Sequence, residues 1–285
     1  MRLPGVLRAA GSHSPAPVAL APGGASIGGI AGVNEHWIGK LDGLRVYNRD
    51  LNASDIGLLA GAGKLIAPIL AEPRAVVITD ENVEKHYLGT LEKSLDESGI
   101  DHQSIVLKAG EQTKDFAHVE ALWGQLLDHR VERTTTLIAL GGGVVGDITG
   151  FAAAVTLRGM DFIQIPTTLL AQVDSSVGGK TGINTPQGKN LIGAFHPPVA
   201  VIADTELLDT LPRRELRAGL FEVVKYGVIA SRTLFERIVT DLPAIFARAR
   251  DAMAASLAAP RLVHADVGAA CRPVRPRAGT SCRSW

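Results

Sequence analysis

Cysteine, net charge and long apolar runs are all scarce in this sequence, and each scarcity excludes a class of protein. Only Cys271 and Cys282 are cysteines, so a disulfide framework is excluded and a reducing cytoplasm is the predicted location. Basic and acidic residues balance at 29 each, which argues against a nucleic-acid or membrane-surface partner. No apolar run is long enough to span a membrane, and prolines and glycines interrupt residues 1–20, which makes them a poor signal peptide.

Hydrophobic residues are plentiful, at 46% of the chain, which is ample for a globular core. A length of 285 residues favours two structural units. Residues 1–27 are rich in Pro, Gly, Ala and Ser, and we expect disorder there. From about residue 61 to residue 230, short apolar runs alternate with helical patterns, which predicts an α/β fold with a parallel sheet.

Polar residues follow the ends of the expected strands. The runs that predict strands cover residues 75–79, 104–107, 137–140 and 162–165. Asp80, Glu111 and Asp147 come after the first three runs, and Thr167 and Thr168 come after the fourth. Because the carboxyl ends of parallel strands meet at one edge of a sheet, we expect these side chains to lie together there, in a Rossmann-like arrangement.

Three consecutive glycines, Gly141 to Gly143, follow the third expected strand. Glycine lets the backbone turn sharply and approach a ligand closely, with N–H groups free to meet phosphate oxygens. The apolar residues after Asp147 predict a helix. The run differs from the G-x-G-x-x-G fingerprint, so this pattern alone does not specify a dinucleotide.

Residues 174–190 combine lysines and a carboxylate with many glycines. Charge at this density among small residues suits an anionic, hydroxylated ligand better than a packed core.

Two helical patterns further along the chain differ in meaning. An apolar stripe predicted to face the core consists of Phe116, Val119, Trp123, Leu126 and Leu127. The expected helix at residues 216–229 carries Glu222 and Lys225 on one face, three residues apart. Taken in isolation, these two residues are best interpreted as an exposed ion pair.

Four segments together resemble 3-dehydroquinate synthase, a family of sugar-phosphate cyclases. They are residues 141–147, 165–184, 188–195 and 222–227, and the match extends from about residue 75 to residue 229. Because the match is long and collinear, the chain is identified as a member of this family. The resemblance implies a Rossmann-like NAD-binding domain at residues 61–230, followed by a helical C-terminal domain.

The resemblance also implies an activity. It indicates a lyase that needs NAD and a divalent metal, zinc or cobalt, and acts on a small-molecule sugar phosphate. Family members convert 3-deoxy-D-arabino-heptulosonate 7-phosphate to 3-dehydroquinate and phosphate, in the shikimate pathway to chorismate and aromatic amino acids. The implied chemistry is a transient oxidation of a ring alcohol by NAD, elimination of phosphate, return of the hydride and an aldol closure. A homodimer is expected.

Individual residues receive roles by the same resemblance. Cofactor contacts are implied for Asp80, Asn82, Glu111, Lys114, Gly142, Gly143, Val144, Asp147, Thr167, Thr168, Lys180, Lys189, Leu207, Leu208 and Thr210. Catalytic or substrate contacts are implied for Asp174, Lys180, Lys189, Asn190 and Lys225, and for Arg158 reaching across a subunit interface. Glu222 is the one implied metal ligand.

The sequence departs from the family where the metal needs its other ligands. The family uses two histidines of a Gly-His-x-x-x-His stretch, and no such stretch occurs here. After Lys225 the one histidine is His264, in an unrelated context. We interpret residues 231–285 as a truncated start of the helical domain, frame-shifted somewhere after Ala254. A catalytic zinc takes three protein ligands, so weak metal binding and impaired activity are expected.

Residues 28–60 resemble a different fold, the closing strands of a laminin-G-like jelly roll. So short a piece would leave open strand edges and too little core. We therefore interpret it as a remnant rather than a working carbohydrate-binding domain.

Two alternatives to 3-dehydroquinate synthase remain. One is another sugar-phosphate cyclase, such as an epi-valiolone or deoxy-inosose synthase, although residues 174–180 most resemble the 3-dehydroquinate synthase branch. The other is a non-catalytic NAD-binding remnant. An incomplete helical domain is also expected to expose an apolar face around Leu220, Phe221 and Val224.

Overall fold

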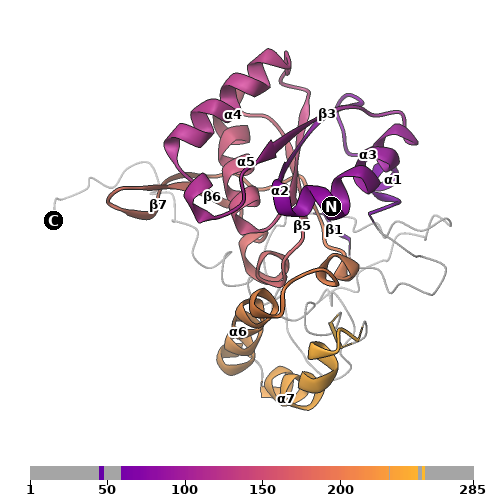
Figure 1. Ribbon diagram of the computed structural model, residues 1–285, viewed down its shortest axis with the longest axis vertical. Helices are drawn as coiled ribbons and strands as arrows, with labels where there is room; N and C mark the ends of the chain where they lie inside the picture. The colour runs from indigo at the N-terminus through magenta and orange to yellow at the C-terminus, as the bar shows by residue number, and fades with distance from the viewer. Residues whose placement is uncertain (1–44, 48–58, 231, 250–251, 254–285) are drawn as a thin grey trace, which may run out of the picture.

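A computed structural model describes residues 45–47, 59–230, 232–249 and 252–253 (Figure 1). At its centre is a six-stranded sheet with the strand order β1-β8-β5-β4-β2-β3, in which all neighbouring strands are parallel. The strands are β1 (Arg45–Tyr47), β2 (Arg74–Asp80), β3 (Asp101–Leu107), β4 (Thr136–Gly141), β5 (Phe162–Pro166) and β8 (Ala200–Ile202). The predicted parallel α/β fold is therefore confirmed.

Helices cover both faces of this sheet. On one side lie α1 (Ala62–Ile66) and α3 (Gly89–Asp96), and on the other lie α4 (Phe116–Asp128) and α5 (Gly143–Val155) (Figure 1). Short turns complete the connections: α2 (Glu81–Val83), η1 (Glu84–Leu88), η2 (Glu111–Thr113), η3 (Thr156–Arg158), η4 (Ala171–Ser175) and η5 (Thr205–Leu208).

A hydrophobic core lies on each face of the sheet, because the side chains of each strand alternate between the two faces. Successive side chains of a strand point to opposite faces, so β2 sends Val76 and Ile78 towards α4 and α5, and Ala75 and Val77 towards α1 and α3. Strand β4 divides its residues in the same way. Both faces are buried, which explains why these strands are continuous apolar runs in the sequence.

The order of the strands creates a switch point between β2 and β4. From β2 the chain moves outward to β3, and it then returns to pair β4 with the other side of β2. In open α/β sheets, ligands bind beside the carboxyl ends of the strands at such a point. Asp80 and Gly141, the last residues of β2 and β4, mark that position here.

A third layer lies beyond the carboxyl edge of the sheet. It is formed by α6 (Arg213–Ala230) and α7 (Arg232–Phe246), which pack against each other, and α6 also packs against η4 (Figure 1). The apolar face predicted to be exposed is only partly so. Leu220 is buried and Val224 is partly buried in this layer, whereas Phe221 is 74% exposed, together with Val228 and Ile229.

An antiparallel hairpin was not expected from the sequence. Strands β6 (Lys180–Thr185) and β7 (Gly188–Phe195) pair with each other and extend to one side of the molecule (Figure 1). β6 packs against α5, while Leu191, Ile192 and Phe195 of β7 are exposed.

Two local predictions need correction. In the expected core stripe of α4, Val119 and Leu126 are buried, but Phe116 and Leu127 are 56% and 57% exposed. The stripe that packs on the sheet is Val119, Leu122 and Leu126, at helical spacing, and the other two side chains lie outside it. The loop formed by the glycine run is also shorter than predicted. The helix was expected after Asp147, but α5 already begins at Gly143.

Other predictions fall largely outside the described part of the chain. Residues 1–27, most of 28–60 and residues 254–285 belong to this group, so the disordered start, the jelly-roll remnant and the frame change stay predictions. Arg45–Tyr47, which is described, pairs parallel with β8 at the edge of the main sheet. Among the helices described, none combines the length and apolar character needed to cross a bilayer.

A buried glycine on α5 tests the packing between this helix and the sheet. A Cβ on Gly150 would lie 2.9 Å from Cζ of the buried Phe162 and would collide with Thr181 Cγ2. We expect Gly150→Ala to lower the free energy of unfolding by about 1–3 kcal/mol, because the core cannot take the extra methyl without strain. Urea denaturation followed by circular dichroism measures this.

Gly124 on α4 provides the matched control. A Cβ there would meet nothing within 4 Å, so Gly124→Ala should raise stability by about 0.5–1 kcal/mol through helix propensity alone. Equal stability changes in the two variants would contradict the packing described.

Candidate functional site

Loops that follow the carboxyl ends of the strands form the site. Asp80 ends β2 and caps α2, its Oδ1 accepting hydrogen bonds from the backbone N–H groups of Asn82 at 2.9 Å and Val83 at 3.1 Å. Asn82 itself is exposed beside this carboxylate. The predicted pair Asp80 and Asn82 therefore lies at the switch point of the sheet.

The glycine loop presents the start of α5 to the same edge. Gly142 is the N-cap of this 13-residue helix, and no side chain caps it. A Cβ on Gly142 would lie 3.1 Å from Thr168 Cγ2, and one on Gly143 would lie 3.1 Å from Ser175 Oγ, so both positions favour the absence of a side chain. The first backbone N–H groups of a helix have no hydrogen-bond partner within the helix. Val144, the second residue of α5, belongs to this first turn. This cradle suits a phosphate-bearing ligand such as a dinucleotide.

Two threonines flank the glycine loop. The N–H of Thr167 donates to Gly141 O at 3.0 Å, which ties the end of β5 to the end of β4. The hydroxyl of Thr167 is buried and has no hydrogen-bond partner among the residues described. The hydroxyl of Thr168 instead accepts from Ala171 N–H at 3.1 Å. The unsatisfied hydroxyl of Thr167 is a second feature that fits a ligand at this point.

A buried lysine connects the turn after β3 to the rest of the site. Lys114 is 4% exposed and donates from Nζ to Asp147 Oδ2 on α5 and, at 2.5 Å, to Asn190 Oδ1 on β7. Glu111, one turn earlier, accepts from Asn184 Nδ2 at 2.8 Å and lies 3.6 Å from Lys189 Nζ. Residues assigned to the cofactor and to the substrate thus lie in one network.

The two carboxylates of this network have opposite pKa shifts. Burial raises the pKa of Asp147 above its ordinary value, and the nearby Glu111 and Asp174 raise it further, although Lys114 opposes them. For Glu111, burial is outweighed by the hydrogen bond from Asn184 and the charges of Lys114 and Lys189, which hold its pKa below the ordinary value. Glu111 is therefore ionised at neutral pH.

A second cluster lies between η4 and α6. The hydroxyl of Tyr226 donates to Asp174 Oδ1 at 3.2 Å, and burial, with the Asp174 charge, raises the pKa of Tyr226. Lys225 forms an ion pair with Glu222 and lies 5.2 Å from the centre of the Tyr226 ring. The prediction that Glu222 and Lys225 share one helix face is confirmed. This cluster offers charged and hydroxyl groups to a polar ligand.

The remaining predicted residues lie at different places relative to these two clusters. Tyr87 OH donates to Leu207 O at 3.0 Å and shares a hydrogen bond of 2.6 Å with Thr210 Oγ1, which fixes the segment that includes the buried Leu207 and Leu208. Lys180 is exposed at the start of β6. Arg158 is exposed at the opposite end of α5 from Gly143, so this chain does not bring it to the cluster.

The metal centre is not completed by the residues described. Glu222 is the candidate carboxylate, and Lys225 already contacts it. In the described ranges no group of three or more His, Cys, Asp or Glu side chains could hold a metal ion. The donor set found therefore does not fit a catalytic zinc or cobalt centre, which needs three protein ligands.

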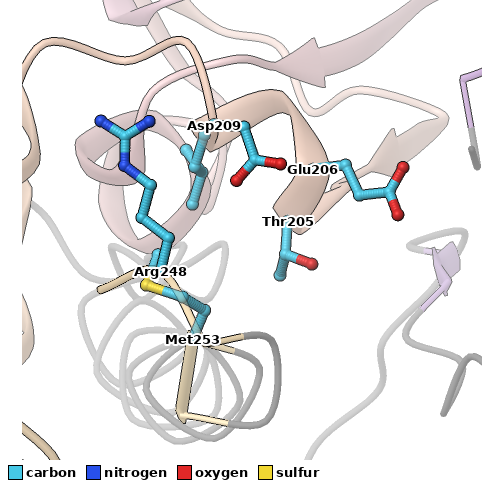
Figure 2. Close-up of a pocket in the computed structure, with 6 residues that line it drawn as sticks. Thr205, Glu206, Asp209, Arg248 and Met253 are labelled. Carbon is cyan, nitrogen blue, oxygen red and sulfur yellow. The ribbon is translucent and has the colours of Figure 1, made fainter. Parts of the chain in front are cut away.

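A separate hollow lies between η5 and the residues that follow α7 (Figure 2). Its lining consists of Thr205, Glu206, Leu208, Asp209, Arg248 and Met253. Arg248 donates to Leu211 O, which holds it against this turn. Of these residues only Leu208 carries a role predicted from the sequence.

Three residues with a part in the site received no role from the sequence. Asn184 and Tyr226 stand inside segments that carry the family resemblance, and that position was their available signal. Tyr87 had none, because its partners at Leu207 and Thr210 lie 120 and 123 residues away.

Comparison with solved structures defines the class. The structure of 2-epi-5-epi-valiolone synthase from Streptomyces hygroscopicus subsp. jinggangensis, with NAD+ and Zn2+ bound, has a TM-score of 0.69 and 27% identity, over 81% of this chain and 61% of that one. An iron-containing alcohol dehydrogenase from Thermotoga maritima shares the fold, with a TM-score of 0.59 and 19% identity over 74% of this chain and 65% of that one. The fold is thus the one shared by sugar-phosphate cyclases and such dehydrogenases.

Sequence comparison narrows the class to one family. Residues 104–218 match the model of the family described as 3-dehydroquinate synthase N-terminal. The 3-dehydroquinate synthase of Rhodospirillum rubrum is 64% identical over 180 residues, which cover 63% of this chain and 47% of that protein. The predicted resemblance to 3-dehydroquinate synthase is confirmed. The chain spans about half the length of the curated relatives it matches.

Removing the buried charge of Lys114 tests the electrostatics of the site. Lys114→Met keeps an apolar stem but leaves Asp147 unpaired, and we expect a loss of about 3–5 kcal/mol in unfolding free energy near neutral pH. The pKa of Asp147 is already raised and should rise further in the variant. A carboxyl group with a raised folded-state pKa loses stability as the pH rises through that pKa, so the deficit should be smaller at pH 5 than at pH 8.

Chemical denaturation at the two pH values measures the effect. Lys93→Met is the control, because Lys93 forms an exposed pair with Glu97 at 3.9 Å and should change stability by less than about 0.5 kcal/mol. A deficit in Lys114→Met that is independent of pH would contradict the role given to Asp147.

Proposed function

We propose that this chain descends from 3-dehydroquinate synthase and carries its NAD-dependent chemistry, the conversion of 3-deoxy-D-arabino-heptulosonate 7-phosphate to 3-dehydroquinate and phosphate. This is the second step of the shikimate pathway. The relatives of 53–64% identity support the assignment. The observation that carries it is the Lys114 network, which joins the turn after β3 to α5 and β7, with Asp174 near enough to Asp147 to raise its pKa.

The residues at the carboxyl ends of β2, β3 and β4 fit NAD. Asp80, Asn82, Glu111 and Lys114 would line the adenosine side, and the N–H groups at the start of α5 would face the pyrophosphate. Thr167 and Thr168 would lie along the nicotinamide half, with Leu207, Leu208 and Thr210 completing the pocket. When bound, NAD supplies reversible hydride acceptance. The protein's own part is to orient both halves and exclude water.

On the substrate side, cations and amides would recognise a polyhydroxy acid phosphate. Asp174 and Asn190 can bind hydroxyl groups, and Lys180, Lys189 and Lys225 can bind the carboxylate and phosphate. Asp174 also accepts from Tyr226, so it remains an oriented acceptor for a substrate hydroxyl. Arg158, at the far end of α5, would serve a neighbouring subunit of a homodimer.

We also propose that turnover by this chain is impaired. The family implies a divalent metal, whereas the described residues offer Glu222 with Lys225 already paired to it. A metal supplies several kcal/mol of transition-state charge stabilisation in such sites. Each ~1.4 kcal/mol corresponds to a factor of ten in rate, so a deficit of about a thousandfold or more is expected.

Two other functions are favoured by particular observations. Another sugar-phosphate cyclase activity is favoured by the structural likeness to 2-epi-5-epi-valiolone synthase and 2-deoxy-scyllo-inosose synthase, at 27% and 25% identity. A non-catalytic NAD-binding protein is favoured by the Lys225–Glu222 pair at the expected metal position.

Phosphate release tests the proposed activity. With NAD, zinc and 3-deoxy-D-arabino-heptulosonate 7-phosphate, the chain should bind NAD but release phosphate about a thousandfold or more slowly than the Rhodospirillum rubrum enzyme assayed alongside. Glu222→Gln should cause little further loss if no metal centre forms. Release at the relative's rate would refute the proposed impairment, and release only from other heptulose phosphates would assign another cyclase.

Cofactor choice gives a separate test. Asp80 and Glu111 are carboxylates near the proposed ribose site, so they should repel a 2′-phosphate, and calorimetry should show at least tenfold tighter binding of NAD than of NADP. Asp80→Asn keeps the N-cap but removes the charge, and it should narrow this ratio. Asp115→Asn changes the N-cap of α4 in the same way and should leave the ratio unchanged. Tighter binding of NADP by the unaltered chain would contradict the assignment.

A further inference from the structure

Asn184 lies at an irregular step of the β6–β7 hairpin. Ile183 pairs with Ile192 and Thr185 pairs with Gly188, so Asn184 alone opposes residues 189–191. An irregularity of this kind releases a residue from the ladder and redirects its side chain. Here the side chain is directed out of the hairpin, towards the turn after β3.

Three hydrogen bonds connect Asn184 to both halves of the site. Its backbone N–H donates to Lys114 O at 2.8 Å, and its Nδ2 donates to Glu111 Oε1, also at 2.8 Å. Its Oδ1 accepts from the backbone N–H of Asn190 at 3.0 Å. An amide is suited to this position, because it donates and accepts at the same time.

Asn190 is held in an unusual conformation by these contacts. Its φ of 56° places it in the left-handed region, which asparagine tolerates better than most residues. Asn184 fixes its backbone N–H, and Lys114 Nζ donates to its Oδ1 at 2.5 Å. The orientation of Asn190 therefore depends on Asn184, which is hydrogen-bonded to Glu111, and on Lys114, which lies on the same turn as Glu111.

A purely local role for Asn184 would be to stabilise the hairpin turn. The bond to Glu111 goes beyond that role, since it joins residues 73 positions apart and ends on the carboxylate with the lowered pKa. A hairpin asparagine needs no such partner. The contact also aligns Glu111 with Asn190, because Asn184 is hydrogen-bonded to both residues.

We propose that Asn184 is a positioning residue that couples cofactor binding at Glu111 to substrate binding at Asn190. The inference rests on the proposed function, because NAD and the sugar phosphate are the ligands being coupled. Coupling is reciprocal, so each ligand should raise the affinity of the chain for the other by the same factor.

Calorimetry measures that factor. NAD is titrated into the full chain with and without 3-deoxy-D-arabino-heptulosonate 7-phosphate, in EDTA so that turnover does not interfere. We expect the substrate to tighten NAD binding by about fivefold or more in the unaltered chain. In Asn184→Ala the factor should fall to about one, whereas Gln187→Ala, which removes an exposed amide from the same hairpin, should retain it.

Exchanging the amide and the carboxylate between positions 184 and 111 provides the rescue. Asn184→Asp places a carboxylate against Glu111, so NAD binding should weaken about tenfold at pH 8 and recover towards pH 5.5 as the two carboxylates share a proton. Combining it with Glu111→Gln restores one donor and one acceptor, and affinity and coupling should return to within about threefold. Neither the pH profile nor the rescue is expected of a residue that only stabilises the turn.

The outcomes separate the two proposals. Absence of NAD binding by the unaltered chain overturns the proposed function, and this inference with it. NAD binding with no effect of the substrate, or an unchanged coupling factor in Asn184→Ala, overturns the inference alone. Should Asn184→Ala fail to fold, failure of the Asn184→Asp, Glu111→Gln double variant to recover affinity overturns it as well.

Discussion

One buried ammonium group holds the functional edge of this protein together. Lys114 comes from the turn after β3, yet its Nζ contacts Asp147 on α5 and Asn190 on β7. A charge at 4% exposure is tolerated only with partners, and here the partners come from α5 and from the β6–β7 hairpin. This one group therefore adds a buried, charged link between the turn after β3, α5 and β7, beside the packing of the hairpin on α5.

Because that charge is fixed, the carboxylates around it can differ in character. Glu111 remains readily ionised, while burial and its acidic neighbours make Asp147 harder to ionise. Asp174, farther along, accepts a hydrogen bond from the hydroxyl of Tyr226. The site therefore combines carboxyl groups of different acidity with several lysines, so its polar groups are not interchangeable.

Much of the sheet could be predicted from the sequence, since strands buried on both faces are continuous apolar runs and the polar residues stand at their ends. The positions of Asp80, Gly142 and Thr167 at or just after the strand ends were predicted in this way. The hairpin was missed because β7 is largely exposed and rich in glycine, so it carries no burial pattern.

Contacts between distant residues were equally invisible to local patterns. Lys114 meets Asp147 and Asn190 at separations of 33 and 76 residues, and periodicity carries no information on such pairs. Phe116 shows a related limit, because a helical stripe predicts a face but not where the sheet beneath it ends.

The position of β2 in the sheet has a consequence for synthesis on the ribosome. Strand β2 can pair with β3 once residue 107 has emerged, but its other edge has no partner until residues 136–141 follow, and β5 and β8 come later still. During that interval a strand with a continuous apolar centre displays unpaired backbone groups, which is the state in which nascent chains associate wrongly. The nascent chain must therefore pass through a stage at which half of its central sheet is open, and the pace of translation between residues 107 and 141 sets how long that stage lasts.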